Sequence, residues 1–164
     1  MESQAPTKPA NYGLIQPAEA KGITGYELIK GIIDGVFPAP PMAKVLNFSL
    51  CEVEPGRAVF IGNPAFDYYN PLGSVHGGLA ATLLDSCMGC AVHSMLPAGV
   101  GYTTLEIKIS FVRPMLENTG SVRAEGKVIS VGKRVGTAEG RIVDAENRLY
   151  AHGTTTCLIF PLSE

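Results

Sequence analysis

The stretch from Gly77 to Leu96, GGLAATLLDSCMGCAVHSML, decides the fold, because it predicts a long helix almost free of charge. Asp85 is its only acidic residue, and it contains no lysine or arginine. The Gly77-Gly78 pair opens this helix, which is expected to run to about Met95, before Pro97 and the glycines that follow it. A helix without a charged face must be covered on most of its sides.

Strand-like segments on both sides of the helix supply that cover. Two precede it and four follow it, at residues 45–54, 57–63, 104–112, 122–128, 134–144 and 149–160. In the third segment, apolar residues from Leu105 to Phe111 alternate with polar ones from Thr104 to Ser110, which is typical of a half-buried antiparallel strand. We therefore expect an α+β fold in which a curved antiparallel sheet of about six strands wraps around one central helix.

The N-terminal region is expected to add one helix to this domain. Residues 1–22 form a polar, proline-containing lead-in for which no fold is predicted, and we expect it to be flexible. Residues 23–36 carry apolar side chains at helical spacing, with Thr24 as the N-cap, and the proline run at 38–41 ends the helix. The length of 164 residues suits one domain, so we expect residues 23–164 to fold as a single unit.

Composition excludes several classes of function. Thirteen basic and fifteen acidic residues give a formal net charge of −2, and no basic run exceeds two residues. Nucleic acids and anionic membranes are therefore not expected as partners. The first twenty residues have no apolar signal segment, and residues 73–100 are too polar to span a bilayer. We expect a cytoplasmic protein whose four cysteines are reduced.

The residues that could carry chemistry lie between Asn70 and Asp85. A carboxylate in an uncharged helix is costly unless it is paired, used, or placed at a solvent-facing rim. The unpaired amides at Gly77 and Gly78, at the positive end of the helix dipole, could polarise a carbonyl group, although two glycines at a helix start more commonly serve close packing on a sheet. A lone histidine such as His76 is more often structural than an acid or base, and Asn70 before Pro71 is equally well explained as a turn residue.

Together these residues resemble the PaaI-type acyl-CoA thioesterases, which have the hotdog fold, over roughly residues 40–160. The resemblance lies in the asparagine, the H-G-G helix start six residues later, the acid nine residues after the histidine, and the strand 104–111 followed by Arg113-Pro114. It implies that the Gly77 N–H polarises the thioester carbonyl and that Asp85 attacks it or activates water. Asn70 and His76 would orient the thioester. Thr104, or Thr103 if a loop differs by one residue, would hold the water.

The substrate-contacting residues are expected to be Gly78, Tyr68, Met88, Lys133 and Arg134. Lys133 and Arg134 lie in a basic turn that could contact a coenzyme A phosphate. No metal and no cofactor are expected, since coenzyme A is part of the substrate. The Cys87-x-x-Cys90 pair lies in mid-helix without a second pair for zinc, and is interpreted as core packing.

Helix geometry bears on the oligomeric state. Gly77 and Asp85 are eight residues apart, about 12 Å along a helix, whereas reacting groups must approach to ~3 Å. A second copy of the helix running antiparallel would place Asp85 of one chain beside Gly77 of the other. We expect at least a dimer, and a homotetramer formed as a dimer of dimers. The alternatives to a thioesterase are a hotdog enoyl-CoA hydratase or dehydratase and an acyl-CoA sensor without turnover.

Overall fold

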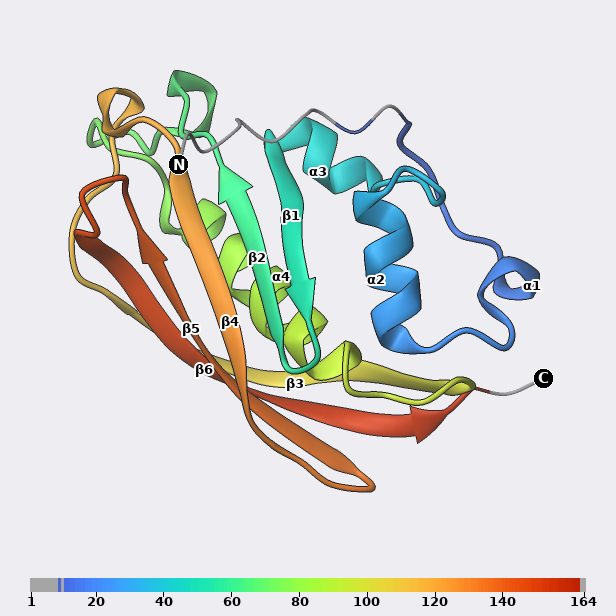
Figure 1. Cartoon of the computed structure of the whole chain (residues 1–164). Coiled ribbons are helices and arrows are strands. Elements are labelled where there is room, and N and C mark those ends of the chain that lie inside the picture. Colours follow the sequence, from blue (N-terminus) through green and yellow to red (C-terminus); the bar gives the residue numbers. More distant parts are fainter. Residues whose placement is uncertain (1–8, 10, 163–164) are drawn as a thin grey trace.

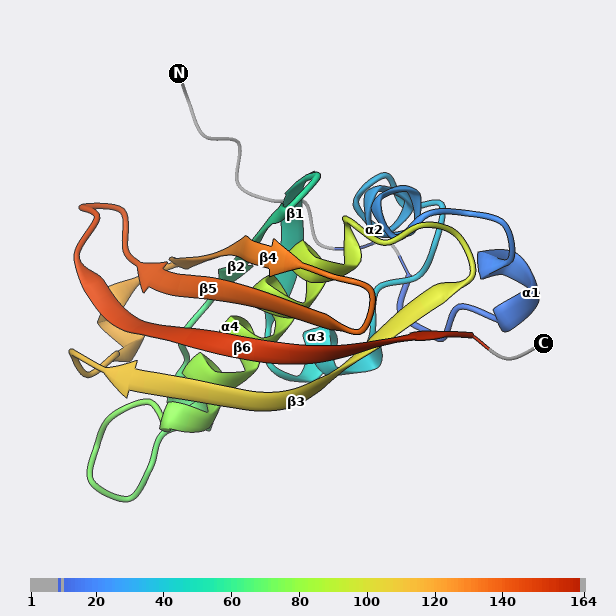
Figure 2. The same ribbon diagram turned by 90° about the horizontal axis from the view of Figure 1, so that it is seen from below.

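The fold is one six-stranded antiparallel sheet curved around a central helix (Figures 1 and 2). The computed structural model describes residue 9 and residues 11–162. The central helix is α4 (Gly77–His93). Along the sheet, the strand order is β1 (Phe48–Glu54), β2 (Arg57–Gly62), β4 (Val122–Val131), β5 (Val135–Val143), β6 (Leu149–Pro161) and β3 (Val100–Phe111). The expected hotdog architecture is confirmed.

The sheet-facing side of α4 forms the centre of the core. Leu83, Leu84, Cys87 and Met88 on this side are fully buried. The helix approaches β4 so closely that a Cβ at Gly126 would overlap the Cys87 carbonyl group. Glycine at position 126 therefore allows α4 to pack closely on the sheet. The side of α4 away from β4 is left for other contacts.

The helix expected over residues 23–36 is α2 (Gly25–Ile33), and Thr24 is its N-cap as predicted. The Thr24 hydroxyl accepts a hydrogen bond from the Glu27 N–H, and the Glu27 carboxylate accepts one from the Thr24 N–H. The Gly25 N–H donates to the Leu96 carbonyl at 3.1 Å, and a side chain at Gly25 would overlap the His93 carbonyl. The start of α2 is thus docked on the end of α4.

Two short helices lie where none was predicted. Pro17–Ala20 form the single turn α1 in the lead-in, and Pro41–Val45 form α3, so the first strand begins at Phe48 rather than at residue 45. Proline is well suited to the first turn of a helix, where its missing N–H has no partner to lose, so the proline run ends one helix and starts another. Tyr12 is also bridged to Ala39. Two 3-10 turns, η1 (Phe66–Tyr68) and η2 (Glu117–Thr119), complete the elements.

The strand β3 differs from its prediction in a way that matters for the site. It begins at Val100, four residues before the predicted start, and a bulge lies between Thr104 and Glu106 in its pairing with β6. The bulge interrupts the simple alternation, so Leu105 is 61% exposed while Ile107 and Ile109 pack against the core. Because β3 is at the edge of the sheet, its outer side carries unpaired backbone groups.

Across the described part of the chain, every helix is too short or too polar to cross a membrane.

Candidate active site

Asp85 of α4 and Thr104 of the edge strand β3 meet at the exposed edge of the sheet. The Asp85 carboxylate is exposed, and its Oδ1 accepts a hydrogen bond of 2.9 Å from the Thr104 hydroxyl. Thr103, the other residue considered for this position, is exposed, and no hydrogen bond joins it to Asp85. Because successive residues of a strand point to opposite faces, only Thr104 of the two threonines faces Asp85. One hydroxyl fixes the carboxylate, whose other oxygen is left for a ligand or water.

The start of α4 distinguishes the two glycine amides. His76 is the N-cap, and its Nδ1 accepts a hydrogen bond of 2.9 Å from the Gly78 N–H. That bond leaves the imidazole proton on Nε2, where it can be donated. Within the described residues, the Gly77 N–H has no acceptor, as expected for the first residue of a helix. Gly77 therefore offers the unoccupied donor, and Gly78 serves the cap.

Asn70 holds the loop that precedes the helix. Its Oδ1 accepts from the Leu72 N–H at 2.9 Å, and its Nδ2 donates to the Ser74 hydroxyl at 3.0 Å. The loop is anchored to its surroundings by the His76 N–H, which donates to the Tyr68 carbonyl at 2.7 Å. Asn70 thus shapes the approach to Gly77 through the loop.

A cleft of about 470 Å³ opens beside Gly77. Asn70, Gly77, Phe111, Arg113 and Tyr150 are among its lining residues. The Phe111 ring is 61% exposed and lies close to Gly77, where a Cβ would be 3.0 Å from it. The Arg113 guanidinium lies 5.6 Å from the centre of the Tyr150 ring.

Sequence reasoning did not assign Phe111 or Tyr150 to a site. Phe111 appeared as one member of an alternating strand, and nothing in the sequence places residue 150 beside residue 77. The Arg113-Pro114 pair, which was part of the family resemblance, was the one available signal for this wall of the cleft.

The residues expected to contact substrate lie in different places. Tyr68 is half-buried near the loop, with its hydroxyl donating to the Val45 carbonyl at 3.1 Å. Met88 is fully buried in the core, so its placement does not support a substrate contact. Lys133 and Arg134 are exposed in the β4–β5 turn. This turn is at the end of the strands away from Val122 and Val143, so the basic pair does not lie beside Gly77 of the same chain.

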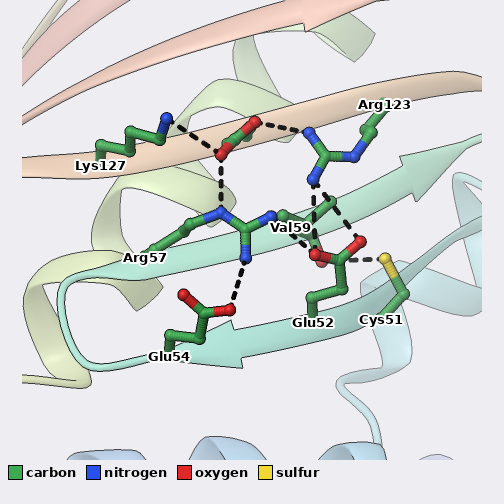
Figure 3. Close-up of polar contacts among 8 residues, drawn as sticks. Cys51, Glu52, Glu54, Arg57, Val59, Arg123 and Lys127 are labelled. Carbon is green, nitrogen blue, oxygen red and sulfur yellow. Dashed lines mark hydrogen bonds and ion pairs between the residues drawn. The ribbon is translucent and has the colours of Figure 1, made fainter.

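The most strongly perturbed carboxylate lies outside this site. On the outer face of β1, β2 and β4, Glu125 accepts from Arg57 at 2.6 Å and from Arg123 at 2.5 Å, and Glu52 accepts from Arg57 at 2.6 Å (Figure 3). Although burial opposes the shift, hydrogen bonds from Arg57 and Arg123 lower the pKa of Glu125 to about 2. Both oxygens of Glu125 and both of Glu52 are paired with arginine side chains, which is typical of a structural network across strands.

No cluster of three or more His, Cys, Asp or Glu side chains suited to a metal ion occurs in residues 9 and 11–162. Within that same part, all four cysteines are free. Burial, together with the smaller effect of the Asp85 charge, raises the pKa of the Cys90 thiol to about 12. The Cys90 thiol is therefore neutral and is not suited to act as a nucleophile.

Comparison with known proteins relates this fold and site to one family. Residues 72–151 match the family model described as Thioesterase superfamily. A putative esterase of Saccharolobus solfataricus is 32% identical over 124 residues, which covers 75% of this chain and 86% of that protein. A putative esterase of Halobacterium salinarum is 38% identical over 96 residues, which covers 54% of this chain but only 62% of the halobacterial protein.

Among solved structures, a mutant of the phenylacetic acid degradation protein PaaI from Thermus thermophilus superimposes with a TM-score of 0.65. Its sequence is 26% identical, and the match covers 72% of this chain and 97% of that one. Because the matched region is shorter than this chain, more than a quarter of the chain lies outside the shared structure.

Proposed function

Since this chain belongs to the thioesterase superfamily, as a PaaI-type member with the hotdog fold, we propose that it hydrolyses an acyl-CoA thioester to a free carboxylic acid and coenzyme A. The observation that carries the proposal is the hydrogen bond that Asp85 of α4 accepts from Thr104 of the edge strand β3. A carboxylate in an uncharged helix, exposed and fixed by one hydrogen bond, is suited to act on a bound ligand.

The Gly77 N–H supports the second requirement of the reaction. Attack on a thioester carbonyl carbon places negative charge on the carbonyl oxygen, and a fixed donor must stabilise that charge. The Gly77 amide is at the positive end of α4 and is not used by the cap, while the His76 Nε2–H lies next to it in sequence as a further donor.

The chemistry leaves two routes open for Asp85. As a general base, it takes a proton from a water molecule whose oxygen bonds to the carbonyl carbon. As a nucleophile, its own oxygen bonds to that carbon, and water later cleaves the mixed anhydride. In both routes the carbon–sulfur bond breaks, coenzyme A leaves as the thiolate and takes up a proton. The Thr104 hydroxyl holds the carboxylate in the orientation that either route requires.

Each site is proposed to be shared by two chains. Gly77 and Asp85 are separated by about 12 Å of helix and cannot both reach one thioester carbon. The unpaired edge of β3 supports association with a second copy, because it presents free backbone groups together with exposed Leu105, Phe111 and Val112. A dimer with antiparallel α4 helices satisfies both features, and a dimer of dimers in the cytoplasm is the assembly that we propose.

The direct test is thiol release. Purified protein is given acetyl-, aromatic and long-chain acyl-CoAs, and free coenzyme A is followed with DTNB. Crotonyl-CoA hydration is followed in parallel at its enoyl absorbance. We expect thiol release that depends on Asp85 and no hydration. Hydration without thiol release would replace the proposal with a hydratase, and tight binding without either reaction would replace it with an acyl-CoA sensor.

A further inference from the structure

A second hollow lies against α4 at Cys90, and its other lining residues all precede the region that matches the family model. Its volume is about 360 Å³, within the usual range of roughly 300–1,000 Å³ for small-molecule pockets. The walls come from five elements and the α2–α3 link: Ile33 of α2, Phe37 of the link, Ala43 of α3, Leu50 of β1, Phe60 of β2 and Cys90 of α4.

The lining of this hollow is suited to an uncharged group. Its named walls are aliphatic, aromatic or thiol side chains, and the Cys90 thiol stays protonated, as described above. Asp34 is also among the lining residues, but its carboxylate is paired with Lys30 one helical turn earlier. A hydrocarbon chain would therefore meet no unpaired charge at these walls.

Cys90 connects the hollow to the reacting carboxylate. It follows Asp85 by five residues on α4, a rise of about 7.5 Å. The charge of Asp85 reaches the Cys90 thiol, since it contributes to the raised pKa of that group. Ser86 lies one helical turn before Cys90, is partly exposed, and follows Asp85 directly. With this spacing, an acyl chain that starts at a carbonyl carbon beside Asp85 has to extend along α4, past Ser86, to reach the hollow at Cys90.

An acyl-CoA consists of a polar coenzyme A part and an apolar acyl chain, and the cleft and the hollow differ in the same way. The cleft beside Gly77 contains Arg113 and Asn70, which suit the coenzyme A part, whereas the hollow at Cys90 is mainly apolar. Building on the proposed function, we propose that the hollow bounded by α2, α3 and Cys90 binds the distal end of an aliphatic acyl chain. The substrate is then a medium-length straight-chain acyl-CoA, and the N-terminal helices set its length limit.

The first measurement is a chain-length series. kcat/KM is determined for saturated acyl-CoAs from two to sixteen carbons. We expect it to rise about fourfold for each methylene group that enters the hollow and to fall sharply beyond a limit. In Ala43→Leu, the added atoms occupy the hollow, so the limit should move to shorter chains. In Ile33→Ala, the removed atoms enlarge it, so the limit should move to longer chains. The matched control is Val45→Leu, also on α3 but 70% exposed, which should keep the parent profile.

A binding measurement separates this inference from the proposed function. Non-hydrolysable S-alkyl-CoA thioethers of the same lengths are titrated by calorimetry into the parent protein and the variants. Chain-length-dependent affinity that shifts in Ala43→Leu and Ile33→Ala supports the hollow, even if no thioester is hydrolysed. If the protein hydrolyses acyl-CoAs but both folded variants keep the parent's length profile in rate and affinity, the acyl chain lies elsewhere and the inference is wrong. Folding of each variant is checked by its thermal transition.

Discussion

The proposed sharing of each active site between two chains makes a prediction that a single-chain site cannot meet. Two variants are prepared separately: Asp85→Asn, which lacks the carboxylate, and Gly77→Val, whose side chain blocks approach to the amide. The Gly77→Val side chain also meets the Phe111 ring, which can give way because the ring is 61% exposed. Each pure variant has one defect in every site, so both are expected to be inactive.

Subunit exchange should restore activity by an amount that the geometry fixes. In a mixed dimer, one site receives both defects and the other receives none, because Asp85 and Gly77 of one site come from different chains. Equal mixing produces about half mixed dimers, each with one intact site in two, so about a quarter of the parent activity should return. If both groups came from the same chain, across about 12 Å of helix, every site in every dimer would carry a defect.

The assay uses the same thiol release as above, together with native mass spectrometry of tagged and untagged subunits. Mass spectrometry establishes that exchange has taken place, and activity is read at the same time points. Complete exchange without any return of activity would refute the shared site. A chain that sediments as a monomer at assay concentration while remaining active would refute it as well, since no partner would then be present.

Four further outcomes follow from single contacts. Asp85→Asn should lower kcat at least ~10²-fold. Thr104→Val should lower kcat about tenfold with little change in KM, because this variant loses the hydrogen bond to the Asp85 carboxylate. A parent-like kcat in either folded variant contradicts these roles. Gly78→Ala places a Cβ 2.9 Å from His76 Nδ1 and should displace the His76 cap, which should lower the free energy of unfolding in urea by about 0.5–2 kcal/mol. The control is His76→Ala, which should lower the free energy of unfolding by a similar amount. Glu125→Gln should destabilise the fold by about 1–2 kcal/mol at neutral pH, after allowance for solvent screening. Since the pKa of Glu125 is about 2 when folded and 4.5 ordinarily, this difference is present above pH 4.5 and should vanish as pH falls towards 2; a difference independent of pH would show that it does not come from the charge.

The central helix was predictable because its signal is local. An uncharged segment opened by two glycines and closed by a proline requires a surrounding sheet, and the six strands follow from alternation and turns. The helix α3 was missed because Pro40 and Pro41 signal both the end of one helix and the start of another. Only the helical backbone of residues 41–45 shows that a new helix starts at these prolines.

The residues of the candidate site could be proposed from the sequence, but their geometry could not. The spacing from His76 to Asp85 is visible in the sequence, whereas the hydrogen bond from Thr104 depends on the pairing of β3 with β6. A strict alternation would have grouped Leu105 with Ile107, and the bulge separates them. Helical periodicity alone does not determine which way the Met88 side chain faces. Met88 lies in the core because α4 packs directly against β4 and β5.

The N-terminal segment and the family-matched region divide the proposed chemistry between them. Asp85, Thr104 and Gly77 all lie within residues 72–151, and their positions depend on α4, β3 and the sheet behind them. The hollow at Cys90 depends on α2 and α3, which precede that region and are attached to it at Gly25 and Leu96. On this arrangement, changes in α2 or α3 can alter which acyl chain fits without moving the carboxylate or the amide. Substrate choice would then vary through one docked segment, while the reacting groups stay fixed on the helix that the sheet encloses.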